Sequence, residues 1–137
     1  MPGLVLEGGT FRPVFSCGVM DALLDHDIMF DYVVGVSAGI TYAASYLSRQ
    51  RERNINILRQ YRGDKRYFGA RNLLHDHSIF GTDFVFDTIP NQLIPFDWET
   101  YHRYKGRILV GVTNAETGRA EYLDGAKLDR TCTMLRA

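Results

Sequence analysis

The stretch Gly35-Val36-Ser37-Ala38-Gly39 decides the predicted fold, because it matches the pattern G-x-S-x-G between a predicted strand and a predicted helix. It follows the β-branched and aromatic run 32–34, which is typical of a buried strand, and it precedes an Ala- and Leu-rich helical run at 40–49. Strand, sharp turn and helix are the context of a nucleophile elbow, in which glycines let strand and helix pass closely. We therefore predict that Ser37 is a catalytic nucleophile held between Gly35 and Gly39. The alternative is an ordinary Gly-Ser turn.

A second glycine motif lies near the N-terminus, where the apolar run 4–6 predicts a short buried strand. The loop that follows contains Gly8, Gly9, Thr10 and Arg12, and a helix is expected from Pro13 onwards. Backbone amides in such a loop can stabilise a developing oxyanion, and an arginine adds a cation beside them. We predict an oxyanion hole here. A phosphate-binding loop is the alternative, although the Walker Lys-Ser pair is missing, and a plain turn is a third possibility.

The order of these elements predicts a βαβα unit and hence a parallel sheet. A strong central strand is expected at 107–113, followed by a turn at 115–118 and a returning hairpin arm at 119–123. Two apolar stripes in the first helix predict burial over much of its circumference. The prediction is one α/β domain over residues 1–137, with a parallel-rich central sheet and helices on both faces in three layers.

Composition is that of an ordinary globular protein, with 45% hydrophobic and 23% charged residues in 137. The formal net charge of zero argues against nucleic acid as a partner. Cys17 and Cys132 lack metal-ligand spacing, and neither a metal nor another cofactor is indicated. With no signal peptide visible, we expect a cytoplasmic protein, and the oligomeric state is left open.

The charge is unevenly distributed along the chain. Residues 49–71 hold eight cations and two anions, whereas residues 1–31 are acidic. We favour a solvated helix face for this basic stretch, and peripheral contact with an anionic membrane surface is the alternative. The cations of the stretch are Arg49, Arg51, Arg53, Arg59, Arg62, Lys65, Arg66 and Arg71.

Together, the loop at 4–13 and the elbow at 35–39 resemble the patatin-like phospholipases, over about the first 50 residues. In that family a Gly-Gly-Gly-x-Arg/Lys-Gly loop forms the oxyanion hole, and here Thr10 and Pro13 replace two of the glycines. The resemblance implies hydrolysis of phospholipids or other acyl esters by a Ser-Asp dyad, without a catalytic histidine.

The dyad aspartate lies in an Asp-Gly-Gly or Asp-Gly-Ala turn in that family, and this chain offers Asp124 in such a turn. Asp124 directly follows the hairpin arm, so we favour a truncated domain whose aspartate lies beyond Ala137 and whose activity is weak or absent. Two other functions stay open. One is a non-catalytic fragment or lipid-surface module, and the other is an α/β-hydrolase with a Ser-His-Asp triad using His75, His77 or His102.

Overall fold

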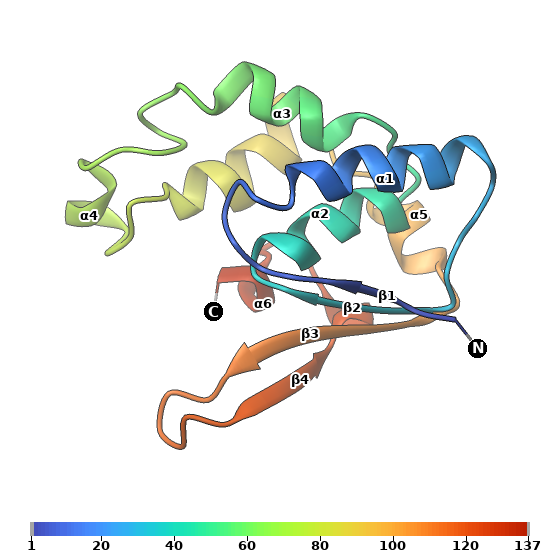
Figure 1. Ribbon diagram of the computed structural model, residues 1–137. Coiled ribbons are helices and arrows are strands. Elements are labelled where there is room, and N and C mark those ends of the chain that lie inside the picture. The colour runs from blue at the N-terminus through green and yellow to red at the C-terminus, as the bar shows by residue number, and fades with distance from the viewer. Residues whose placement is uncertain (1, 137) are drawn as a thin grey trace.

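A four-stranded sheet forms the centre of the computed structural model, which describes residues 2–136 and only the backbone of His75 (Figure 1). The strand order is β1-β2-β3-β4; the first three strands are parallel, and β4 is antiparallel to β3. This confirms the predicted α/β class with a parallel-rich sheet. The strands are β1 (Leu4–Leu6), β2 (Tyr32–Val36), β3 (Arg107–Thr113) and β4 (Ala120–Asp124).

The described helices lie over one face of this sheet (Figure 1). On the other face Val5 remains 75% exposed, and Val36 and Tyr122 are exposed as well. The layer arrangement thus differs from the expected helices on both faces, because the described helices that pack on the sheet cover the face of Leu6, Val33 and Val110. The helices are α1 (Val14–Asp25), α2 (Ala38–Leu47), α3 (Arg53–Tyr61), α4 (Asn72–His75), the π-helix η1 (Phe84–Leu93), α5 (Trp98–Arg103), the 3₁₀ turn η2 (Gly125–Lys127) and α6 (Thr133–Arg136).

Helix α1 is less buried than its two apolar stripes predict. The stripe that contains Cys17 and Met20 is buried, since it packs towards α2 and α3. The stripe of Phe15 and Val19 faces solvent, and Phe15 is 81% exposed. The prediction of burial over much of the circumference was therefore wrong, because only one side of α1 has neighbours in the described structure.

Helix α2 is the central helix of the fold, and its residues from 42 to 47 are all buried. Its small residues let it lie directly against the strands, and Ala43 is completely inaccessible to solvent. The hydroxyl of Tyr46 donates to the carbonyl of Ile28 at 2.8 Å and accepts from the amide of Phe30 at 3.1 Å. These bonds anchor α2 to the loop before β2, and so fix the direction in which β2 enters the elbow.

Candidate active site

The elbow at Ser37 has the strained backbone that its sequence predicts. Ser37 directly follows β2 and caps α2, with φ 51° and ψ −125°, a conformation that non-glycine residues rarely adopt. A Cβ on Gly35 would lie 2.6 Å from Ile40 Cα, and one on Gly39 would lie 2.5 Å from the Glu7 carbonyl oxygen. Both positions therefore require glycine, and the close crossing of β2 and α2 leaves Ser37 exposed at the turn.

The Gly8–Arg12 loop lies beside this serine. A Cβ on Gly8 would be only 3.1 Å from Ser37 Cβ, so the loop backbone approaches the serine closely. The loop turns through positive φ at Gly9 (129°) and Thr10 (55°), and the Arg12 amide donates to the Gly9 carbonyl at 2.9 Å. The Tyr42 hydroxyl on α2 donates to the Thr10 carbonyl at 3.3 Å, which ties the loop to the elbow helix.

Several backbone amides around Ser37 have no acceptor among the described residues. Within residues 2–136, the amides of Gly9 and Thr10 donate no hydrogen bond, and neither does that of Ala38 at the first position of α2. Amides at a helix N-terminus lack an intrahelical acceptor, and the helix dipole adds partial positive charge there. An anion that develops next to Ser37 would therefore meet unpaired donors from two elements. Sequence reasoning placed the Gly9 and Thr10 amides here but did not name that of Ala38.

The Arg12 side chain lies on the exposed side of the glycine loop. Its Nη2 is 3.0 Å from Glu7 Oε1, and both side chains are largely exposed. Its aliphatic stem covers Gly9, where Cδ would lie 3.3 Å from an added Cβ. Arg12 is absent from the side chains that line the cleft described next. In this structure it supports the shape of the loop, and its role beside an oxyanion stays a prediction.

Ser37 opens into a cleft of about 740 Å³ at the carboxyl ends of β2 and β3. Thr10 and Phe11 of the glycine loop line one part, and β3 and β4 line another. Aromatic and aliphatic side chains supply much of the remaining wall, which suits an acyl chain. These include Tyr42, Tyr67, Phe80, Val85, Phe86 and Leu135, together with the hydroxyl-bearing Ser78 and Thr82.

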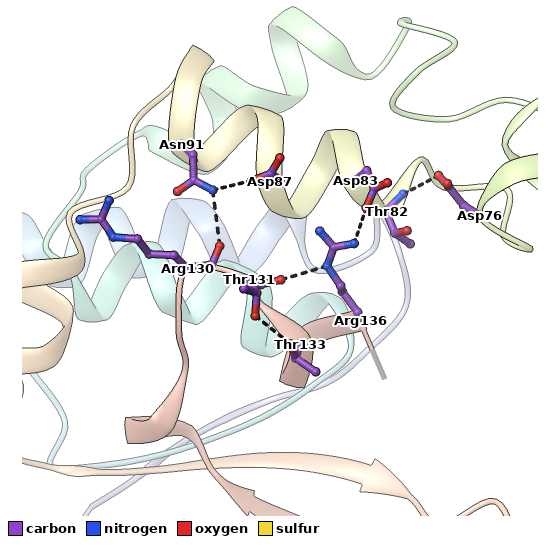
Figure 2. Close-up of polar contacts among 9 residues, drawn as sticks. All are labelled: Asp76, Thr82, Asp83, Asp87, Asn91, Arg130, Thr131, Thr133 and Arg136. Carbon is purple, nitrogen blue, oxygen red and sulfur yellow. Dashed lines mark hydrogen bonds and ion pairs between the residues drawn. The ribbon is translucent and has the colours of Figure 1, made fainter.

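One wall of the cleft is formed by η1 and the C-terminal segment, which polar contacts hold together (Figure 2). Asn91 Nδ2 donates to Asp87 Oδ1 at 2.9 Å and to the Arg130 carbonyl at 3.4 Å. Arg136 forms an ion pair with Asp83, and its Nε donates to the Thr131 carbonyl. These contacts position Leu135 and Arg136, both of which line the cleft.

The described part of the cleft lining contains no Asp, Glu or His, and Ser37 Oγ forms no hydrogen bond within residues 2–136. Asp124 pairs with Leu109, which pairs with Val34, three residues before the serine. Asp124 is therefore two strand spacings, about 10 Å, across the sheet and three residues, about 10 Å, along it from Ser37. Its Oδ1 accepts from the Ala126 amide at 3.1 Å and caps η2. Asp124 and Ser37 are not brought together.

The histidines are also away from the serine, as far as the structure describes them. His102 is on α5, where Nε2 lies 2.8 Å from the Leu128 carbonyl oxygen and the ring stacks on Trp98. His77 is exposed with φ 51° and does not line the cleft, and the side chain of His75 lies outside the described residues. No group of three potential metal ligands occurs in the described chain.

Three tyrosines line the cleft, of which Tyr42 and Tyr67 are buried and Tyr122 is exposed. Burial raises the pKa of Tyr42 and also that of Tyr67. Both phenols are therefore protonated at neutral pH, so they can donate hydrogen bonds but cannot serve as general bases. No signal in the sequence distinguished these two tyrosines from core residues.

The fold and the site define an α/β protein with a serine elbow beside a glycine loop at the carboxyl edge of a parallel sheet. The family model described as patatin-like phospholipase matches residues 4–133, so the chain belongs to that family. Lipid acyl hydrolysis is the general activity of the family, and lipids are its class of substrate. No curated protein and no solved structure gave a significant match. Among the described helices, none has the length and apolar character needed to cross a membrane.

Proposed function

We propose that this protein hydrolyses acyl esters of lipids with Ser37 as the nucleophile. The observation that carries the proposal is the strained, exposed Ser37, which lies beside unpaired amides and opens into the cleft. Family membership supports the substrate class. The elbow keeps the hydroxyl at the surface of the turn, where a lipid ester carbonyl can reach it.

In the proposed reaction Ser37 Oγ attacks the ester carbonyl carbon and transfers its proton to a base. The negative charge that forms on the carbonyl oxygen is stabilised by the amides of Gly9, Thr10 and Ala38. The carbon–oxygen bond to the alcohol then breaks, and the base returns the proton to the leaving alcohol. Water hydrolyses the acyl-serine in a second, equivalent step. Removing one such donor typically lowers kcat by about 10²–10³.

The base is proposed to be an aspartate, as the resemblance to the family implies. Asp124 is a poor candidate, because two strand spacings separate it from β2 and its carboxylate caps η2. The histidine triad is not favoured either, since His77 and His102 are absent from the cleft lining. No aspartate of the described residues lines the cleft.

A second candidate function is lipid binding without turnover. It is favoured by the absence of Asp, Glu and His from the described cleft lining. A serine that lacks a base keeps its proton, and general-base catalysis contributes about 10²–10⁴-fold. Such a protein would bind acyl chains in the cleft and release them unchanged.

One experiment separates the two functions. We expect protein that carries the dyad aspartate to hydrolyse a p-nitrophenyl acyl ester and to be labelled by a fluorophosphonate at Ser37, with both lost in Ser37→Ala. Ser78→Ala is the matched control, because Ser78 lines the same cleft, and it should retain labelling. An adduct mapped by mass spectrometry to Ser78 or Ser45 contradicts the nucleophile assignment. Acyl-chain binding without turnover or labelling favours the binding module.

A further inference from the structure

The segment 68–80, called the tip below, projects from the body of the molecule. Its base is closed by the bridge between Phe68 and Phe80 and by the bond from the Gly69 amide to the Ile79 carbonyl at 2.9 Å. Helix α4 lies at its end, at the far left of Figure 1 and on the side where β2 leads into α2. The tip is therefore at the same end of the sheet as the cleft.

The tip exposes large apolar side chains. Leu74 is 81% exposed and Leu73 51% exposed, both on α4, and Ile79 is exposed as well. These adjacent leucines on a projecting helical turn do not pack into the hydrophobic core of the protein. Such residues at an extremity are typical of a surface that is covered by lipid or by a partner.

Two exposed cations, Lys65 and Arg71, lie at the tip. Neither has a carboxylate within ion-pair distance among the described residues. Both flank α4, since Asn72 Nδ2 donates to the Lys65 carbonyl at 3.3 Å and Arg71 precedes the helix. Their acidic neighbours are engaged elsewhere: Asp64 pairs with Arg66, and Asp76 accepts from the Thr82 amide.

Other cations of the basic stretch are already paired with carboxylates or buried. Arg49 pairs with Asp27, and Arg51 pairs with Asp25, so the acidic end of α1 takes up two of its cations. Arg53 is turned inward, where Nη2 donates to the Ile94 carbonyl at 2.8 Å. The positive charge left for an external anion is thus concentrated near the tip and the end of α3, at Arg59, Arg62, Lys65 and Arg71.

The tip is physically connected to the mouth of the cleft. The Phe68 ring contacts those of Phe80 and Phe11, with centroids 5.1 and 6.0 Å apart. Phe80 and Phe11 line the cleft. Asp76 reaches from the tip to the Thr82 amide, as Figure 2 shows, and Thr82 also lines the cleft. A membrane bound at the tip would therefore lie next to the entrance used by a lipid.

We propose that the tip is a membrane-docking element that inserts Leu73 and Leu74 into an anionic phospholipid surface while Lys65 and Arg71 contact the headgroups. Apolar insertion and attraction between cations and anionic headgroups act together in such docking. The occupant is a bilayer rather than a protein, because the exposed leucines, the unpaired cations and the mouth of a lipid-binding cleft occur at one end of the molecule. This proposal rests on the proposed function for its lipid substrate.

Sedimentation with vesicles tests the docking apart from catalysis when all variants carry Ser37→Ala, which prevents substrate turnover. The parent protein should bind phosphatidylcholine vesicles that contain phosphatidylglycerol, and binding should fall when salt is raised or phosphatidylglycerol is omitted. The double variant Leu73→Ser with Leu74→Ser should bind at least about tenfold more weakly to the anionic vesicles. Lys65→Gln with Arg71→Gln should lower binding and reduce its salt dependence.

Ile28→Ser is the matched control, because Ile28 is an exposed aliphatic residue before β2, at the opposite end of the sheet. It should bind as the parent does, and circular dichroism checks that each variant is folded. Parent-level binding by the double leucine variant, an equal loss in the control, or indifference to phosphatidylglycerol overturns the proposal. If the protein with Ser37 intact hydrolyses a soluble short-chain ester but does not bind vesicles, the docking proposal alone is refuted. Vesicle binding without any turnover refutes the proposed function alone.

Discussion

At the scale of single residues, the elbow depends on the absence of side chains at two glycines. Replacing Gly35 by alanine places a Cβ 2.6 Å from Ile40 Cα, and this contact involves backbone that cannot turn aside. We expect Gly35→Ala to lower the free energy of unfolding by about 3 kcal/mol, the upper part of the range for overpacking. Denaturant unfolding followed by circular dichroism measures the change.

Gly18→Ala is the control for this prediction. Gly18 lies in α1, and nothing is within 4 Å of its added Cβ. Alanine there should raise the free energy of unfolding by about 0.5–1 kcal/mol, since glycine is the poorer helix former. If the two variants change stability alike, the tight crossing of β2 and α2 is not a constraint.

Sequence reasoning works well for such residues because their chemistry is local. The motif around Ser37 predicted a strand, a sharp turn and a helix, and the positive φ at Ser37 follows from that turn. The partner of the serine is not a local property. The residues Asp-Gly-Ala at 124–126 fit the family motif. The position of Asp124 is decided by the pairing of β4 with β3, which places it two strands away from β2.

At the scale of elements, a buried polar network joins α2 to α3. Asn54 accepts from Ser45 Oγ at 2.8 Å and donates to the Tyr42 carbonyl at 2.9 Å, and both Asn54 and Ser45 are buried. Asn54→Ala leaves the buried Ser45 hydroxyl without this partner, which costs about 1–3 kcal/mol of folding free energy. We expect a loss of this size in thermal or denaturant unfolding.

Asn56→Ala provides the comparison on the same helix. Asn56 is only partly buried, and its side chain makes no hydrogen bond to another described residue. Its replacement should change the free energy of unfolding by less than about 0.5 kcal/mol. A loss in Asn54→Ala no greater than in Asn56→Ala would show that the network does not hold α3 in place.

Element prediction succeeded where the apolar period is regular and failed where packing decides. The strands Leu4–Leu6 and Arg107–Thr113 were predicted with the bounds observed. The two apolar stripes of α1 predicted burial on both sides, but only the stripe with Cys17 and Met20 is buried, because the packing partners of a helix are not visible in its own apolar period.

At the scale of the whole molecule, buried thiols and phenols make stability depend on alkaline pH. Burial raises the pKa of Cys17 to about 12, that of Cys132 to about 11 and that of Tyr104 to about 12. Burial also raises the pKa of Tyr101. In each case the folded protein retains a proton that the unfolded chain releases first.

The sign of the effect follows from proton binding. Once pH exceeds the ordinary thiol pKa of about 9, the unfolded state binds fewer protons than the folded state, so stability falls as pH rises. Arg53 acts in the opposite direction, because burial lowers its pKa to about 10 and its deprotonation favours the folded state above that pH. One guanidinium does not offset two thiols that begin to titrate at lower pH.

We therefore expect the free energy of unfolding to fall between pH 8 and pH 10, with about 1 kcal/mol from each buried thiol. Urea unfolding at the two pH values measures the loss. Cys17→Ala should be less stable than wild type at pH 8 yet lose about 1 kcal/mol less on going to pH 10, because the titrating group is gone. Met20→Ala is the matched control, since Met20 is an equally buried side chain on α1 that does not titrate. It should destabilise the protein while keeping the wild-type pH dependence. A Cys17→Ala variant with that same pH dependence would show that the Cys17 thiol is not the source of the alkaline loss.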